Sequence, residues 1–285
     1  MRGEEQGAVT TPLANPMLNW LRRRFWFVAF CVVAAAWLYA PLRNVVLQIE
    51  VTPAQRGLQV AHRAGCFGCH GPDGGGGVKN PGSADEEVPG FAGGTPMMWA
   101  QSDTELREYI LDGAPQRKRN DPRHQAQMHA QLLTMPAYRG HLGDHEVDDL
   151  LAYIRAVSGL IRPPEPLAAR GQDLAVRLGC FLCHGPMGAG GTGNPGSLKG
   201  YIPGWWGNDF RELVRDDAEL RGWILDGGIS RLREHPVARY FLTRQRVPMP
   251  AYRRFVSESD LEALVLYVQW VNAGEWQGKP LDLGH

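Results

Sequence analysis

Four of the five cysteines lie in two copies of one short motif that could hold a redox cofactor. Each copy reads C-x-x-C-H, and the copies end at His70 and His184. Two thiols at this spacing can add to the two vinyl groups of haem, and the adjacent imidazole can then bind the iron. The motifs therefore predict two covalently bound c-type haems, with His70 and His184 as axial iron ligands. The predicted attachment residues are Cys66, Cys69, Cys180 and Cys183.

Other uses of paired cysteines fit the sequence less well. A thioredoxin-like C-x-x-C motif needs a preceding strand and a βαβ context, and no such pattern precedes either copy. A zinc site built from both pairs would have to join residues 66–69 to residues 180–183, which is far beyond the usual spacing of zinc ligands. Chance can produce one C-x-x-C-H motif, but two copies in one chain favour haem.

The two motifs belong to a longer internal repeat with an offset of 114 residues. The segment NPGS occurs at 80–83 and again at 194–197, and MPAYR occurs at 135–139 and again at 249–253. These pairings need no gap, which is the signature of a duplicated unit. The sequence therefore predicts two similar modules at 52–160 and 167–274, joined by a short proline-rich linker at 161–166.

The repeat also selects a sixth ligand for each iron. In the first module the candidates are Met97, Met98, Met128, Met135, His124, His129, His141 and His145. Only Met135 has a residue able to bind iron 114 positions further on, and that residue is Met249. We therefore expect His70 and Met135 to bind one iron and His184 and Met249 to bind the other. The remaining methionines are interpreted as core or loop residues.

Each module should be mostly helical, because helix signals recur and no alternating strand pattern appears. A first helix begins at Pro53 or Leu167 and leads to the cysteine motif. A middle helix begins after Ser102 or Asp216, residues that favour helix starts, and ends at a glycine. The last helix of each module has a continuous apolar face. The basic segments 114–134 and 228–248 are interpreted either as solvated loops or as docking surfaces that balance the haem carboxylates.

One uncharged run precedes both modules. Residues 25–42 are 18 residues without a charge, flanked by arginines at 22–24 and by Arg43. This length is near the minimum for a membrane span, and the arginine excess places residues 1–24 in the cytoplasm. We therefore expect a retained transmembrane helix with the modules on the periplasmic side of the cytoplasmic membrane. The alternative is a cleaved signal peptide ending near 34–36. Residues 275–285 form a tail.

The modules resemble class I c-type cytochromes, and the resemblance covers both of them. In that family the first and last helices cross where a glycine meets an aromatic residue, which Gly57 with Tyr153 and Gly171 with Tyr267 would match. The family also uses a loop proline whose carbonyl accepts a hydrogen bond from the axial histidine, and Pro81 and Pro195 are the positional candidates. The expected fold class is all-α, with two fused class I cytochrome c domains preceded by one transmembrane helix.

The expected function is electron transfer rather than catalysis. Two six-coordinate irons would leave no site for a small-molecule substrate, and a formal net charge of zero does not favour nucleic-acid binding. The expected partners are the membrane, through the N-terminal helix, and a redox complex: a quinol-oxidising complex, a terminal oxidase or a photosynthetic reaction centre. The alternatives are a two-haem peroxidase with one open iron and a haem-based sensor.

Overall fold

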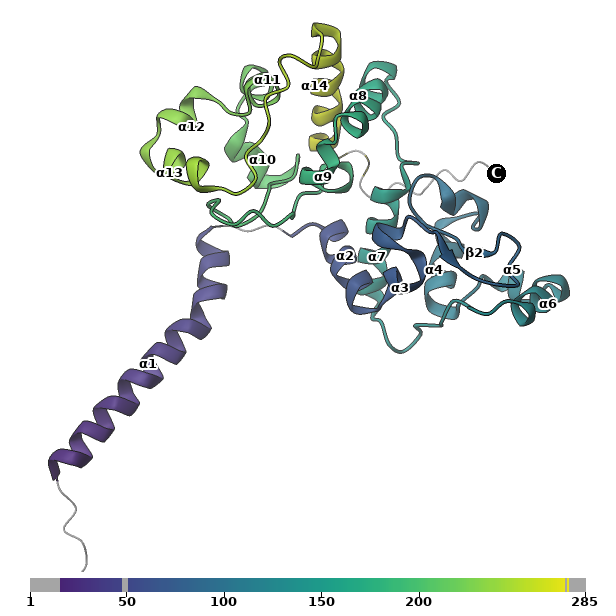
Figure 1. The fold of residues 1–285 in the computed structure, drawn as a ribbon, viewed down its shortest axis with the longest axis horizontal. Helices are drawn as coiled ribbons and strands as arrows, with labels where there is room; N and C mark the ends of the chain where they lie inside the picture. The colour runs from purple at the N-terminus through teal and green to yellow at the C-terminus, as the bar shows by residue number, and fades with distance from the viewer. Residues whose placement is uncertain (1–15, 48–50, 275, 277–285) are drawn as a thin grey trace, which may run out of the picture. The chain divides into compact units, whose positions relative to one another are not determined.

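The computed structural model describes residues 16–47, 51–274 and 276, and most of these residues lie in helices (Figure 1). The chain divides into two compact units, Met1–Ile49 and Glu50–His285. The described part of the first unit is the long helix α1 (Pro16–Val46). The second unit contains both C-x-x-C-H motifs.

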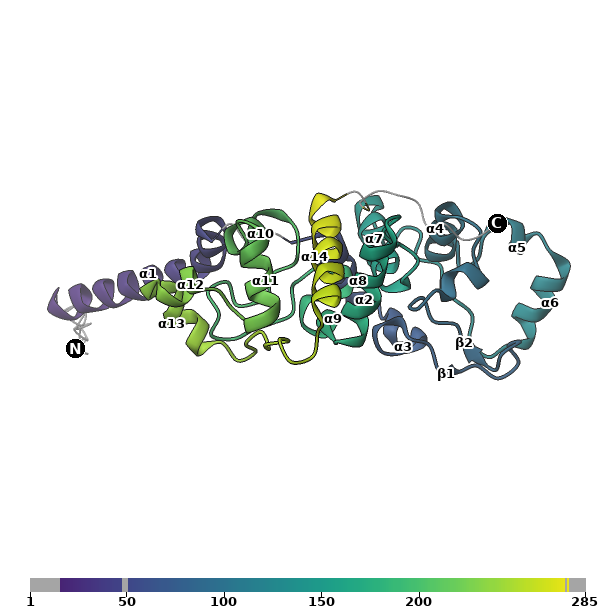
Figure 2. The ribbon, with the colours of Figure 1, turned by 90° about the horizontal axis from the view of Figure 1, so that it is seen from above.

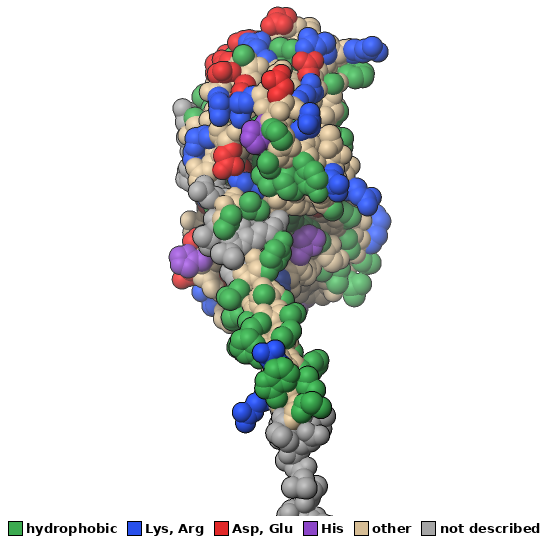
Figure 3. Space-filling model, turned by 90° about the vertical axis from the view of Figure 1, so that its left-hand side faces the viewer, with side chains coloured by type: hydrophobic (Ala, Val, Ile, Leu, Met, Phe, Trp, Pro, Cys, Tyr) green, Lys and Arg blue, Asp and Glu red, His purple; other side chains and the backbone are tan. Residues whose placement is uncertain are grey.

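The prediction of a transmembrane helix over residues 25–42 is wrong. Among the helices of the described residues, none combines the length and the apolar character that a membrane crossing requires. The sequence does form a helix there, and Figure 3 shows apolar side chains along it. However, Arg22, Arg23 and Arg24 lie within the same continuous helix, and the uncharged run only reaches the lower limit for a span. The predicted periplasmic location depended on this span and stays a prediction.

Among its described residues, the first half of the second unit carries six α-helices, two short 3₁₀ turns and one small strand pair around the first motif. Its α-helices are α2 (Pro53–Arg63), α3 (Cys66–His70), α4 (Asp103–Asp112), α5 (Gln116–Arg119), α6 (Pro122–Ala130) and α7 (Asp144–Ser158), and its short 3₁₀ turns include η1 (Pro72–Gly74) and η2 (Thr95–Met98). Strands β1 (Val78–Lys79) and β2 (Glu87–Val88) pair antiparallel, with Val78 opposite Val88. Two residues are too few to give an alternating pattern, so the sequence did not predict this pair.

The second half follows a similar order of helices around the second motif. It contains α8 (Pro166–Arg177), α9 (Cys180–His184), η3 (Pro186–Gly188), α10 (Gly207–Leu213), α11 (Asp217–Asp226), α12 (Ser230–Glu234), α13 (Pro236–Arg244) and α14 (Glu258–Ala273). The segments 114–134 and 228–248 are not simple loops, because they fold into α5 and α6 and into α12 and α13. Helix α8 begins at the last residue of the predicted linker, with Glu165 accepting hydrogen bonds at its N-terminus.

Two close helix crossings hold the unit together. Helix α2 packs on α7, and α8 packs on α14 (Figure 2). A Cβ atom added to Gly57 would lie 1.9 Å from the Asp149 carbonyl oxygen, and one added to Gly171 would lie 2.0 Å from the Ala263 oxygen. Tyr153 and Tyr267, both fully buried, face these glycines. The predicted contact between a glycine and an aromatic residue is therefore present at both crossings.

Substitution of Gly171 by alanine should strongly destabilise the second half of the unit. The added methyl group would force α8 away from α14, and overpacking of this kind costs about 1–3 kcal/mol or more. We expect the midpoint of chemical unfolding to fall accordingly. Gly193→Ala is the control, because nothing lies within 4 Å of a Cβ at that position. Equal stability of the two variants would show that the helices separate without cost.

The middle helices begin and end as the sequence predicts. The Ser102 side chain accepts a hydrogen bond from the Glu105 amide, and Asp216 accepts one from the Glu219 amide. Both helices end at glycines in the left-handed region, Gly113 and Gly227. Glu105 and Glu219 then bind arginines from the following short helices, Arg117 and Arg231, at 2.9 and 2.6 Å. These ion pairs attach the basic segments to the middle helices.

The Glu219–Arg231 ion pair makes stability depend on pH. Its hydrogen bond to Arg231 lowers the pKa of Glu219 to about 2. Because the folded pKa lies below the unfolded one, the stabilisation is present above about pH 4.5 and is lost as pH falls towards 2. Glu219→Gln should lower the free energy of unfolding by about 1 kcal/mol at neutral pH and by much less near pH 2. Urea unfolding at both pH values tests this, with the exposed Glu234→Gln as control.

Candidate functional site

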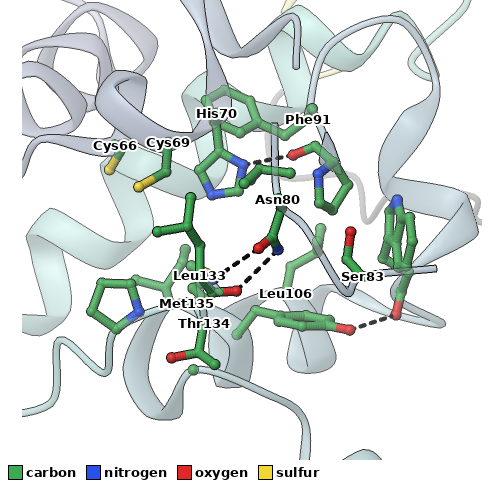
Figure 4. A pocket seen from close by; sticks show the side chains of 18 of the residues that line it. Cys66, Cys69, His70, Asn80, Ser83, Phe91, Leu106, Leu133, Thr134 and Met135 are labelled. Atoms are coloured by element: carbon green, nitrogen blue, oxygen red, sulfur yellow. Dashed lines mark hydrogen bonds between the residues drawn. The ribbon is translucent and has the colours of Figure 1, made fainter. Parts of the chain in front are cut away.

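A short helix places the first cysteine pair and its histidine at the edge of a cavity. Helix α3 starts after Gly65 and stops at Gly71, and both glycines have positive φ values that L side chains rarely adopt. The one turn between them puts Cys66, Cys69 and His70 on the cavity wall (Figure 4). The sequence thus forms a compact turn in which both sulfurs and the imidazole serve one site.

A proline carbonyl orients each imidazole. The Nδ1 atom of His70 lies 2.7 Å from the Pro89 oxygen, and that of His184 lies 3.0 Å from the Pro203 oxygen. A carbonyl can only accept, so Nδ1 carries the proton and Nε2 keeps a free electron pair for a metal. Burial lowers the pKa of both histidines, which further favours this neutral form.

The proposed role of Pro81 and Pro195 in this contact is corrected by the geometry. Their carbonyls accept hydrogen bonds from the Leu132 and Arg246 amides instead. The two prolines that do contact the histidines, Pro89 and Pro203, are also separated by 114 residues and precede a glycine in both copies. The repeat therefore contained this signal, but proximity to the conspicuous NPGS segment directed the prediction to the wrong pair.

The cavity beside His70 has a volume of about 430 Å³, within the range of cofactor pockets. Its wall includes Cys66, Cys69, His70, Phe91 and Met135, so the structure brings together the attachment residues and the predicted sixth ligand of the first module. Apolar side chains such as Leu106 and Ile154 complete it. An apolar cavity whose wall carries imidazole and thioether groups suits a flat apolar cofactor that contains a metal ion.

Most of the other candidate ligands lie outside this cavity. Met98 is 70% exposed, and Met97 also faces solvent. Met128 does reach the wall, but its sulfur accepts a hydrogen bond from the Gln131 side chain at 3.2 Å. His124 also lines the cavity, yet the residue 114 positions further on is Ala238. Met135 therefore stays the expected partner of His70.

Hydrogen bonds from both sides hold the loop that carries Met135. Asn80, only 3% exposed, accepts from the Leu133 amide at 2.7 Å and donates to the Leu133 carbonyl at 3.0 Å. The Tyr138 hydroxyl donates to the Ala64 carbonyl at the end of α2. These bonds fix the loop on both sides of Met135 in the sequence, to Asn80 on one side and to the end of α2 on the other.

Replacing Asn80 by alanine should loosen this loop. The change leaves the backbone N–H and C=O groups of Leu133 unpaired in a partly buried place, which costs about 2 kcal/mol. We expect the free energy of unfolding to fall by that amount in urea titrations. The exposed Asn120→Ala is the matched control and should change stability by less than about 0.5 kcal/mol. Equal losses for both variants would contradict the assigned role of Asn80.

The second motif is surrounded by the same hydrogen bonds as the first. Asn194 accepts from the Val247 amide and donates to the Val247 carbonyl, and the Tyr252 hydroxyl donates to the Leu178 carbonyl. Trp205 takes the place of Phe91 beside the histidine ring. Met249 packs against the core cluster that also contacts Cys180. The predicted residues of the second module thus lie in one neighbourhood.

The first cysteine of each pair, Cys66 or Cys180, is not an activated thiol. Cys66, Cys69, Cys180 and Cys183 are all free and half-buried. Burial raises the pKa of Cys66, and it raises the pKa of Cys180 to about 11. Reactive or metal-binding cysteines have lowered pKa values because they act as thiolates. This environment argues against thiol redox chemistry and agrees with sulfurs that end as thioethers.

The polar end of the first cavity completes the fit to haem. The Nε1 atom of Trp99 and the Nε2 atom of His124 are buried without a hydrogen-bond partner among the described residues. Lys118 lies at the same end, its ammonium 2.6 Å from the Tyr109 hydroxyl. These groups can bind the two carboxylates of a haem, which favours the counter-charge interpretation for this part of segment 114–134. Cys66, Cys69, His70 and Met135 would hold the ring and its iron.

In this helical domain a pair of thiols, an imidazole and a methionine line one apolar cavity. This combination is typical of domains that bind haem covalently. A protein-family model, Cytochrome c, matches residues 54–158. The match supports a cytochrome c domain over this part of the chain, which implies covalently bound haem c and suggests a haem-based electron carrier. Searches of curated proteins and of solved structures gave no significant match.

Proposed function

We propose that the chain is a two-haem electron carrier and that residues 167–274 form a second cytochrome c domain. The observation that carries this proposal is the recurrence of the site contacts at the 114-residue offset. The histidine–proline contact, the asparagine that holds the methionine loop and the tyrosine hydroxyl bond all occur twice. A segment that repeats these three contacts around a C-x-x-C-H motif is built to hold a second haem.

In this proposal the chain's residues supply attachment, ligation and insulation. Cys180 and Cys183 would hold the second haem as Cys66 and Cys69 would hold the first. His70 and Met135 would bind one iron, and His184 and Met249 would bind the other. Methionine opposite histidine raises the reduction potential. The apolar cavity acts in the same direction, because it disfavours the extra positive charge of the oxidised iron.

Electron exchange with other proteins, rather than substrate turnover, is the corresponding activity. Two irons that each bind both a histidine and a methionine would have no free coordination position for peroxide or another substrate. We therefore propose that the chain is not an enzyme. The potential of a histidine–methionine haem suits a carrier between a quinol-oxidising complex and a terminal oxidase or reaction centre. One electron is gained or lost at a time, and no proton transfer is required.

The haem content of the purified holoprotein tests the proposal. Intact-mass spectrometry under denaturing conditions should show a polypeptide that carries two haems, because thioether bonds survive unfolding. The haem-to-protein ratio from the absorbance of the pyridine complex should also be two. A mass corresponding to one haem would restrict the function to the domain at residues 54–158 and would overturn the two-haem proposal.

A further inference from the structure

One side chain of the second half lies inside the core of the first. Met187, on η3, is 2% exposed and belongs to the core cluster that contains Tyr153, Val147 and Leu150 of α7. The turn η3 contacts both α7 and α14. Because Met187 follows His184 by only three residues, the loop on the histidine side of the second site is anchored in the first module.

Further contacts make this interface continuous. The Gln55 side chain on α2 donates a hydrogen bond to the Ala189 carbonyl at 2.7 Å. Trp206 and Trp276 pack edge to face with ring centroids 5.3 Å apart, and both contact the same cluster as Met187. The interface is therefore packed like a core rather than like a transient contact between domains.

Aromatic side chains lead from each axial histidine towards this interface. In the first module His70, Phe91 and Tyr153 follow one another, with centroid distances of 5.3 and 6.0 Å. In the second module His184 contacts Trp205, which contacts Tyr267, at 5.2 and 5.8 Å. Tyr267 stacks on Trp270 at 6.1 Å, and Trp270 packs against the core clusters of both modules.

We propose that Met187 is a positioning residue that fixes the histidine sides of the two sites against each other. Electrons then pass between the two haems across this contact, through Trp205, Tyr267 and Trp270 on one side and Phe91 and Tyr153 on the other. The step moves one electron from an iron(II) to an iron(III) and needs no further reagent. This inference rests on the proposed two-haem function and adds the route between the haems.

The equivalent turn of the first module provides a matched control. Asp73 occupies the position 114 residues before Met187 and has nearly the same backbone, with φ values of 53° and 51°. Asp73, however, is exposed. Replacing either residue by alanine perturbs the same turn, but only Met187→Ala removes a side chain from the interface. Met187→Leu keeps an apolar side chain of similar volume and should therefore preserve the interface.

Two measurements on the holoprotein test the inference. Flash reduction by a photoexcited dye should be followed in the native protein by a concentration-independent phase of electron transfer between the haems. In Met187→Ala this phase should be lost. Amide hydrogen exchange at Gly188 and Gly190 should speed up roughly 30-fold or more, the lower end of the effect of removing a buried methionine. Asp73→Ala and Met187→Leu should behave as the native protein does.

The outcomes separate this inference from the function on which it rests. Faster amide exchange in Met187→Ala with an unchanged electron-transfer phase would overturn the inference while two haems remain bound. A native protein that binds only one haem would overturn the proposed function and the inference with it. If Met187→Ala loses its second haem, the Trp270→Leu variant is measured instead. The electron-transfer phase between the haems should be lost in that variant too. Persistence of this phase in Trp270→Leu would overturn the proposed route.

Discussion

Replacing Cys180 and Cys183 together by alanine should halve the covalent haem content. Without the thiols the second haem has no covalent attachment, whereas Cys66 packs against the other core cluster, to which neither Cys180 nor Cys183 belongs. Intact mass should fall by one haem, and the absorbance of the remaining haem should keep the form seen in the native protein. The expected change in haem content is large because a haem without thioether bonds is not counted as covalently bound.

The fifth cysteine provides the control for that experiment. Cys31 lies exposed on α1, outside the unit that contains both motifs. Cys31→Ala should keep the full haem content. Loss of all haem from the double variant at 180 and 183 would mean that the first site cannot fold without the second. An unchanged content would show that the second motif never carried haem.

Replacing Met135 by alanine should open the first iron and lower its reduction potential. Methionine stabilises the reduced iron, and axial ligands set haem potentials over a range of about 0.8 V. We expect a fall by an appreciable fraction of that range in a spectroelectrochemical titration, while the second haem keeps its potential. The titration should therefore separate into two clearly resolved steps.

Met98→Ala is the matched control for the ligand assignment. Met98 is exposed and does not line the cavity, so both potentials should stay at their native values. An unchanged potential in Met135→Ala would contradict the assignment. In that case Met128 and His124, the other cavity-lining candidates, would be the residues to replace next.

The repeat made most of the site predictable from sequence. Matching the two copies selected Met135 and Met249 among several methionines and histidines, and the structure places Met135 on the cavity wall with His70. The glycines at the helix crossings were expected from the resemblance to class I c-type cytochromes. The structure adds the physical reason, because a Cβ there would meet backbone atoms of the opposite helix. A steric requirement of this kind restricts the position to glycine.

Other features left weaker marks. The contact between His70 and Pro89 is made by a backbone carbonyl, so side-chain chemistry does not single it out. Helices α5 and α12 are too short for helical periodicity to show. The prediction of a membrane span at residues 25–42 rested on the length of the uncharged run alone. It did not take into account the arginines that lie in the same helix. The burial of Met187 depends on how the modules pack, which the repeat could not reveal.

Addition of carbon monoxide to the fully reduced protein tests the central claim most directly. A methionine bound to each iron should leave no free position, so the Soret absorption should not change. This result would support two closed, histidine–methionine haems and a function in electron transfer. A change corresponding to one or both haems would contradict the account, because an open iron would make the chain a candidate for ligand binding or peroxide chemistry.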